Sequence, residues 1–369
     1  MKGPTMNVRD SAPGPEAGGA PKKKDHGVLY LGIDLGTSRT SIAASNGVRE
    51  TVASVVGYPK DVVSQKLLQR ETLFGDEAIE NRLALRFYRP LEKGVIKGSD
   101  GKVLASEEAE ANLRAAKDLL RHAIGLARPR PDELVYGVVG APAQASIQNQ
   151  KMLVEAARET LDAVMICSEP FAVAYGLEWL DDVLVIDIGA GTVDLCRMHG
   201  TMPEEGDQIT LPTAGDWVDE QIEELLRERC KGAQFSRQMV KALKEKHSNV
   251  RDEGTPTVVD LPVRGKPTPF DVTDCIREGC RRIIPPIVES LGELVASFDP
   301  EFQDRLRNRV LLAGGGSQIG GLDRAIEESM REHLGGGRVI RIEEPVYGGA
   351  NGALKIAHDM PPDFWQKLR

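Results

Sequence analysis

One pattern occurs twice in this chain: an apolar strand, an aspartate, a glycine turn, a threonine and a second strand. The first copy covers residues 28–43 and contains Asp34, and the second covers residues 183–196 and contains Asp187. Glycines after each aspartate allow a turn too tight for side chains, and strand-like alternation then resumes. The two aspartates are about one domain length apart, so the chain is expected to contain two related α/β units.

Each of these turns is a candidate phosphate site. Successive backbone N–H groups in a glycine turn can hold an anion, and a carboxylate at the strand end can hold Mg²⁺ through its water shell. A single Asp-x-Gly-Thr is more often only a hairpin turn, but two copies one domain apart are more specific. The candidate residues are Asp34, Gly36, Thr37 and Ser38 in the first turn, and Asp187, Gly189, Ala190, Gly191 and Thr192 in the second.

A third glycine loop follows a predicted strand at residues 309–313. It contains Gly314, Gly315, Gly316 and Ser317 and precedes a predicted helix at residues 323–333. Its glycines would allow the backbone to lie flat against a ring or a phosphate. The alternative is an ordinary loop at the entrance of a helix.

Strand and helix patterns alternate in both halves, which favours an α/β fold. Residues 59–97 and 249–270 interrupt the alternation and are predicted to be inserts. A long helix is expected over residues 271–297, with a break at Pro285-Pro286. The other expected elements are strands at 134–139, 163–167 and 339–342, and helices at 78–87, 106–125, 146–161, 215–229, 236–246 and 348–357.

Three polar residues near the predicted turns have ordinary explanations. Glu169 precedes Pro170 at the expected start of a helix, where the helix dipole favours a negative charge. Cys167 lies in an apolar run and is expected to fill the core. Asp194 alternates with apolar residues along its strand, so it is expected to face solvent and is left out of the candidate site.

The composition excludes several classes of function. The net charge of −9 and the lack of a dense basic block after residues 22–24 argue against a nucleic-acid partner. The five cysteines form no C-x-x-C pair and the six histidines have no zinc-site spacing, which favours reduced thiols and no transition metal. No apolar run is long enough for a membrane span, and residues 1–27 are expected to be a disordered arm of a cytoplasmic protein.

Five segments together resemble the signature motifs of the actin, Hsp70 and sugar-kinase superfamily. They are the two aspartate turns, the Glu169-Pro170 pair, the loop at Gly314 and the G-G-A run at Gly348, and they extend over nearly all of residues 28–357. The segments V-V-G-Y-P, F-G-D-E-A and R-P-L-E-K-G-V-I in the first insert resemble actins and the bacterial actin MreB more than Hsp70. With S-E-P-F, A-G-G-G-S and the tail M-P-P-D-F-W-Q-K-L, the chain most resembles the bacterial actins that organise magnetosome chains.

The resemblance implies an actin-like ATPase fold. Two ribonuclease-H-like domains, each with a small inserted subdomain, would hold a nucleotide in the cleft between them. The implied bounds are residues 28–180 for domain I with its insert at 59–97, residues 181–357 for domain II with its insert at 216–270, and residues 358–369 for a C-terminal tail.

The resemblance also implies roles for individual residues. ATP or GTP would bind with Mg²⁺, which Asp34 and Asp187 would hold. Catalysis is assigned to Asp187 and to Glu169, which would orient or deprotonate the attacking water. The loop Gly314–Ser317 would lie along the nucleoside with Lys244 near it. Lys241 stands where MreB-type chains have a glutamate that contacts the ribose.

The implied function is a cytoskeletal ATPase that polymerises with ATP, disassembles after hydrolysis and positions magnetosome chains. Its implied partners are other copies of itself and magnetosome-associated proteins such as the acidic anchor protein MamJ, and it would lie in the cytoplasm along the magnetosome chain. The alternatives are a sugar-type kinase or an Hsp70-like nucleotide switch of the same superfamily, and a non-hydrolysing adaptor. No general-base aspartate with sugar-binding neighbours is evident in the sequence, and this disfavours the kinase.

Overall fold

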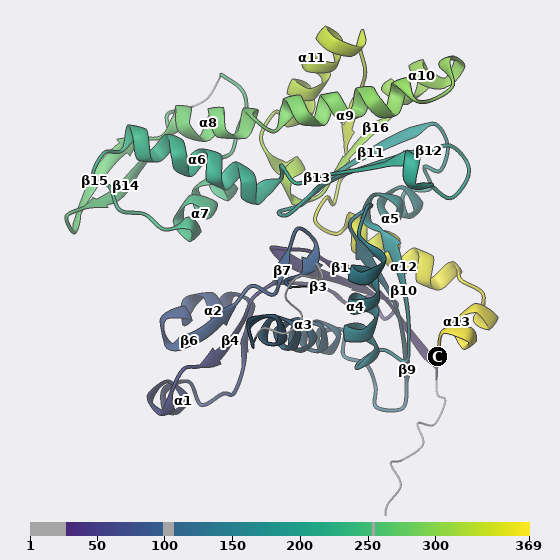
Figure 1. Ribbon diagram of the computed structural model, residues 1–369, viewed down its shortest axis with the longest axis horizontal. Coiled ribbons are helices and arrows are strands. Elements are labelled where there is room, and N and C mark those ends of the chain that lie inside the picture. Colours follow the sequence, from purple (N-terminus) through teal and green to yellow (C-terminus); the bar gives the residue numbers. More distant parts are fainter. Residues whose placement is uncertain (1–26, 99–106, 253–254) are drawn as a thin grey trace, which may run out of the picture.

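The computed structural model describes residues 27–98, 107–252 and 255–369. Two five-stranded mixed sheets, one from each half of the chain, form its centre, and helices cover their faces (Figure 1). The expected N-terminal arm up to residue 26 and the expected helix start at Ser106 lie outside the described residues. Within those residues, no helix is both long and apolar enough to cross a membrane.

The first sheet contains the first predicted hairpin. Its strands are, in spatial order, β10 (Ala163–Ser168), β9 (Leu134–Ala141), β1 (Val28–Leu35), β2 (Arg39–Ala44) and β3 (Arg49–Ala53). β1 pairs antiparallel with β2 and parallel with β9. All residues of β9 are buried, as expected for a central strand that is covered on both faces. The helices of this half are α3 (Glu107–Leu126), α4 (Ile147–Arg158) and α5 (Glu169–Gly176), and α12 (Gly348–Asp359) and α13 (Pro362–Leu368) return to it.

The second sheet repeats this connectivity. Its strands are, in spatial order, β13 (Gln208–Leu211), β12 (Val193–Met198), β11 (Val183–Ile188), β16 (Val310–Ala313) and β17 (Val339–Arg341). β11 pairs antiparallel with β12 and parallel with β16, so each half has an N-terminal hairpin followed by parallel strands. The predicted pair of related α/β units is therefore confirmed. The helical elements of this half are η2 (Glu205–Asp207), α6 (Gly215–Arg229), α8 (Thr273–Arg281), α9 (Ile284–Ala296), α10 (Pro300–Arg307), η3 (Gly315–Gln318) and α11 (Leu322–Leu334).

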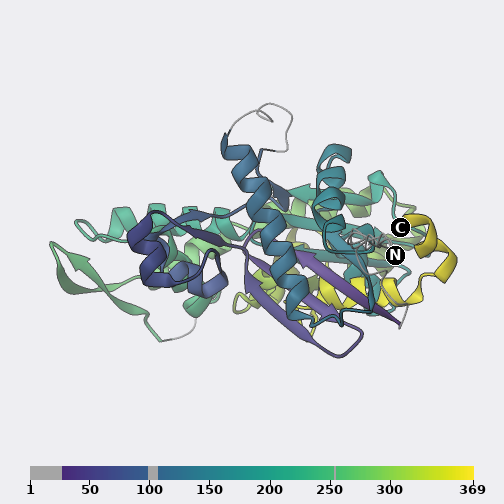
Figure 2. The ribbon, with the colours of Figure 1, turned by 90° about the horizontal axis from the view of Figure 1, so that it is seen from below.

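Two excursions project from the same end of the molecule, opposite α13 (Figure 2). In the first half the elements are β4 (Val56–Pro59), α1 (Val62–Leu68), β5 (Leu73–Phe74), α2 (Gly75–Glu80), η1 (Arg82–Ala84), β6 (Leu85–Tyr88), β7 (Leu91–Glu92) and β8 (Val95–Ile96). In the second half they are α7 (Arg237–His247) and the hairpin of β14 (Val258–Val263) and β15 (Lys266–Asp271). The exact domain and insert bounds stay predictions.

Two local predictions had different outcomes. The expected break in the helix at residues 271–297 is confirmed, because α8 ends at Arg281 and Pro285 and Pro286 lie in the first turn of α9, where a missing N–H costs nothing. The helix expected over 78–87 was wrong for most of its length, because α2 ends at Glu80 and only the 3-10 turn η1 follows it. Residues Leu85–Tyr88 instead form β6, because pairing with β4 outweighs their helix-like spacing.

The two halves share a core in which helices α5 and α12 approach very closely. A Cβ on Gly352 of α12 would lie 1.7 Å from the carbonyl oxygen of Ala172, and a Cβ on Gly32 of β1 would lie 2.0 Å from the carbonyl oxygen of Ala350. The buried residues around this contact come from β9, α5, β11, β12 and α12. Glycine is therefore required at positions 32 and 352 because neighbouring backbone lies too close for a side chain, and not because the backbone adopts an unusual turn.

Gly352→Ala should destabilise the protein by about 3 kcal/mol, since its methyl group can be accommodated only if the backbone of α5 or α12 moves. Gly125→Ala is the matched control, because Gly125 is exposed in α3 and its Cβ would meet no atom within 4 Å. That control should stabilise by about 0.5–1 kcal/mol. Chemical denaturation measures both variants, and similar midpoints for the two would contradict the close packing of α5 and α12.

Candidate functional site

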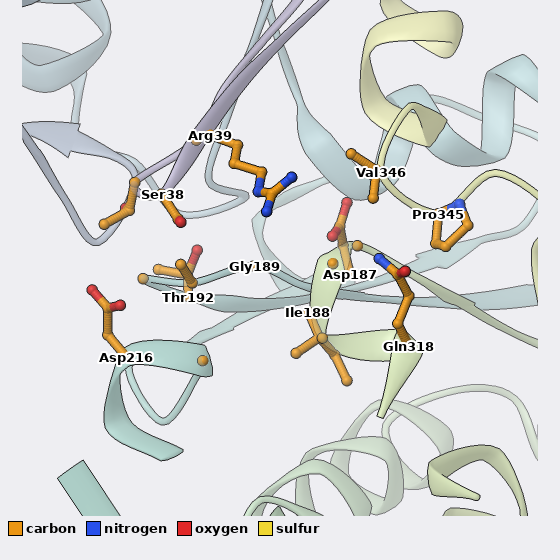
Figure 3. Close-up of a pocket in the computed structure, with 18 of the residues that line it drawn as sticks. Ser38, Arg39, Asp187, Ile188, Gly189, Thr192, Asp216, Gln318, Pro345 and Val346 are labelled. Carbon is orange, nitrogen blue, oxygen red and sulfur yellow. The ribbon is translucent and has the colours of Figure 1, made fainter. Parts of the chain in front are cut away.

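A cavity of about 340 Å³ lies between the two sheets at the two predicted turns. This volume is at the lower end of the range for small-ligand pockets, about 300–1,000 Å³. Ser38 and Arg39 face Thr192 and Asp216 across the opening (Figure 3). The predicted residues that line the cavity are Asp34, Gly36, Thr37, Ser38, Glu169, Asp187, Gly189, Ala190, Gly191, Thr192, Lys244, Gly314, Gly315 and Gly316.

The two glycine turns touch each other. A Cβ on Gly191 would lie 2.4 Å from Oγ1 of Thr37 and 2.7 Å from Cα of Lys93. Thr37 Oγ1 also accepts a hydrogen bond of 2.8 Å from the backbone N–H of Gly94. The absence of a side chain at Gly191 thus lets the turn of the second sheet approach both the first turn and the insert of the first half.

Three carboxyl groups, those of Asp34, Glu169 and Asp187, converge on the floor of the cavity. Burial raises the pKa of Asp34 to about 7. The pKa values of Glu169 and Asp187 are raised well above the usual range, first by burial and then by repulsion from neighbouring carboxylates. Such a group binds protons, a cation, or both, so the donor set suits Mg²⁺. No three of the described His, Cys, Asp and Glu residues are arranged to hold a metal directly.

Asp194 was predicted to face solvent, and this was wrong. It lies opposite Asp187 in the hairpin and is only 1% exposed. Its Oδ1 accepts hydrogen bonds from the backbone N–H of Ala143 at 2.8 Å and from Thr210 Oγ1 at 2.5 Å. The side of β12 that carries Asp194 meets the loop after β9, and the paired strand β13 places Thr210 beside it. Strand alternation alone does not reveal such a contact.

The third glycine loop packs against the floor of the cavity. Gly314 has a φ of +78°, and a Cβ there would lie 2.3 Å from Oδ1 of Asp187, so only glycine fits both the conformation and the space. Ser317 does not line the cavity. Its side chain is buried, and its hydroxyl donates to the carbonyl oxygen of Gly314 at 2.7 Å, which fixes the loop.

The structure also accounts for Lys244 and Cys167. Lys244 lines the cavity, but its ammonium group lies 2.7 Å from Asp219 and donates to the carbonyl oxygen of Gly215 at 2.5 Å, so it also ties α7 to α6. Burial raises the pKa of the Cys167 thiol to about 12, so this cysteine is no nucleophile at neutral pH.

Sequence reasoning missed a group of residues that close the cavity from the sides. Arg39 and Ser41 follow the first turn directly in β2, and the others come from helices and loops distant in sequence from the two turns. No local motif marks them except the position of Pro345 and Val346 just before the G-G-A run. The group includes Arg39, Ser41, Gly94, Gly215, Asp216, Glu245, Ser248, Gln318, Pro345 and Val346.

The fold defines a class of protein: an actin-like ATPase built from two related α/β units around a central cavity. The family model described as MreB/Mbl protein matches residues 29–361. The chain belongs to the MreB/Mbl family of actin-like ATPases. The predicted actin-like fold and the predicted family are thus confirmed.

The similar proteins include several called MamK. The chain is 40% identical to the actin-like protein MamK of Paramagnetospirillum magneticum over 92% of this chain and 95% of that one, and 38% identical to the actin-like protein MamK of Magnetospirillum gryphiswaldense over 92% of each. A MamK double helical filament has a TM-score of 0.85 at 38% identity, with 90% of this chain and 99% of that chain covered. A non-polymerising MamK mutant bound to AMPPNP has a TM-score of 0.67 at 38% identity, with 91% and 100% covered.

Asp187→Asn should stabilise the nucleotide-free protein by about 1 kcal/mol, or about 2 °C in Tm, because it keeps the shape of the side chain and removes one repelling charge. Mg²⁺ with ATP should then raise the Tm of this variant less than that of the wild type. Asp216→Asn is the control, because Asp216 already has Arg89 at 3.4 Å and should give no gain. Differential scanning fluorimetry measures all three proteins, and an unchanged or lower Tm for nucleotide-free Asp187→Asn would refute the repulsion.

Proposed function

We propose that this chain is a cytoskeletal ATPase that polymerises into filaments with ATP bound and disassembles after hydrolysis. The observation that carries the proposal is the contact of two glycine turns, one from each half, over a floor of buried carboxylates. A nucleotide bound there would touch both halves at once and would favour their closed arrangement. The similarity to proteins named as MamK filaments supports the proposal that the closed arrangement is the one that polymerises.

The chemistry assigned to the floor is hydrolysis of the terminal phosphate. Asp34 and Asp187 would hold Mg²⁺ through water, and the metal would neutralise charge on the phosphates. The backbone N–H groups of the two turns would bind the phosphate oxygens. Glu169 begins α5 beside Asp34 and Asp187, and it would orient the attacking water and accept its proton. ATP is the proposed nucleotide, with GTP as the alternative.

Polar contacts across the mouth of the cleft support a link between nucleotide binding and closure. Arg89 of the first half lies 3.4 Å from Asp216 of α6, and Arg39 lies 3.7 Å from Glu245 of α7. Both pairs are partly exposed, so each contributes little energy by itself. They can therefore form and break as the two halves close and open around a nucleotide.

We further propose that the filaments organise and position magnetosome chains in a magnetotactic bacterium. The support is the identity of about 40% to proteins named MamK over almost the whole chain. The proposed location is the cytoplasm, along the magnetosome chain. The proposed partners are further copies of this chain and magnetosome-associated proteins, with an acidic anchor of the MamJ kind as the candidate.

A subunit contact is proposed at the insert of the first half. Four large apolar side chains there are 71–85% exposed, namely Val62, Val63, Leu67 and Leu83. They lie on α1 and η1, at the projecting end of the molecule (Figure 1). Exposed apolar side chains gathered on one projecting segment are typical of an interaction surface, and head-to-tail contacts generate open filaments.

Glu169→Ala should slow ATP hydrolysis by about 10²- to 10⁴-fold and leave assembly intact, because it removes only the group that positions water. The variant should sediment with Mg²⁺ and ATP as the wild type does, and its filaments should persist after wild-type filaments have disassembled. Sedimentation and phosphate release are measured side by side, with ADP as the control. If the variant is folded and binds ATP but does not sediment, Glu169 has a structural role. If filaments of the variant disassemble at the wild-type rate, hydrolysis does not set the filament lifetime.

Leu83→Asp should reduce sedimentation with ATP at least tenfold while nucleotide binding stays within about twofold, because a buried unpaired charge would weaken the subunit contact by about 1.4 kcal/mol or more. In magnetotactic cells that lack their own filament protein, it should also fail to restore the magnetosome chain. Met202→Asp is the control, since Met202 is 68% exposed in the loop before η2. If Leu83→Asp reduces filament formation and nucleotide binding equally, the variant is misfolded and Leu83 is not assigned to a subunit contact.

A further inference from the structure

Lys241 connects the two sides of the cleft at the phosphate turn of the first half. It lies in α7, and its Nζ donates to Oγ of Ser38 at 2.5 Å. Ser38 belongs to the tight turn between β1 and β2, and both residues line the cavity. The ammonium group of Lys241 is therefore beside the backbone of the first glycine turn, although its own helix belongs to the other half of the chain.

The positive charge of Lys241 is incompletely neutralised. Its nearest carboxylate is that of Glu245 at 3.8 Å, and the Glu245 side chain is 43% exposed. One turn further along the same helix, by contrast, Lys244 has the buried carboxylate of Asp219 at 2.7 Å. The side chain of Lys241 is only 17% exposed, so a charge that is nearly out of water lacks a close partner.

The surroundings of Lys241 add further positive charge. Burial is the largest cause that lowers the pKa of Lys241, and repulsion from Arg89 and Arg39 lowers it as well, while Glu245 and Asp216 act in the opposite direction. Three cationic side chains thus meet at the mouth of a cavity whose floor is acidic. An anion between them would relieve the repulsion that the cations exert on one another.

We infer that Lys241 binds a phosphate oxygen of the nucleotide, together with the Ser38 turn, and thereby ties α7 to the first half when nucleotide is bound. An ammonium group has three N–H donors and no acceptor, so it suits a phosphate oxygen. The inference rests on the proposed nucleotide function and assigns this residue to the polyphosphate instead of the ribose.

The test compares the full-length wild type with Lys241→Gln, Lys241→Arg and the control Lys246→Gln. Lys246 is exposed on the same helix, so its variant removes the same charge without touching the cavity. Equilibrium binding is measured for three magnesium-bound ligands: ATP, 2′-deoxy-ATP and inorganic tripolyphosphate, which has no ribose. Thermal unfolding of each variant confirms that it is folded.

Lys241→Gln should weaken the binding of both ATP and tripolyphosphate at least tenfold, while the ratio of ATP to 2′-deoxy-ATP affinity stays unchanged. Lys241→Arg should retain most of the affinity, and Lys246→Gln should bind like the wild type. Loss of ATP affinity with unchanged tripolyphosphate affinity, or a collapsed preference for ATP over 2′-deoxy-ATP, would make Lys241 a ribose contact and overturn the inference. Unchanged affinity for every ligand would overturn it too, whereas a wild type that binds no nucleotide would defeat the proposed function itself.

Discussion

Buried carboxylates that repel one another are the constraint on which the rest of this structure depends. The duplicated hairpins bring Asp34 and Asp187 to the same point between the two sheets, and α5 adds Glu169. Removal from bulk water raises the pKa of all three groups, and repulsion from neighbouring carboxylates raises the pKa values of Glu169 and Asp187 further. Such a cluster lowers the stability of the nucleotide-free protein, and in the proposed function a bound metal–nucleotide complex would relieve the repulsion. Binding would then act on the junction of the two halves.

Glycine packing makes that junction narrow enough for one ligand to contact both halves. Gly191 allows the second turn to reach Thr37, and Gly314 allows the third loop to reach Asp187. At the other side of the junction, Gly352 lets α12 lie against α5. The junction is therefore closely packed on this side, whereas ion pairs that are partly exposed join the two halves at the mouth. Such an arrangement is expected of a hinge that closes on a ligand.

Much of the fold could be predicted from the sequence because the two hairpin motifs are local. Tight glycine turns and apolar strands impose their conformation within about fifteen residues, and they also identify the carboxylates at the strand ends. Asp194 was placed wrongly because alternation along a strand separates two faces without showing what covers each. The contacts of Lys241, Arg39 and Arg89 could not be predicted, because they depend on how the two halves are placed relative to each other.

The distribution of charge along the cavity explains how hydrolysis can loosen such a cleft. The acidic floor and the basic mouth both favour a metal–polyphosphate between them, and each separately disfavours an empty closed state. Under the proposed function, loss of the terminal phosphate would remove negative charge from between the two turns. The cations at the mouth are then left with Asp216 and Glu245 as their counter-charges, which are partly exposed and screened by water. In the proposed function, opening would become less costly at that moment, and a surface presented only by the closed arrangement would be lost with it.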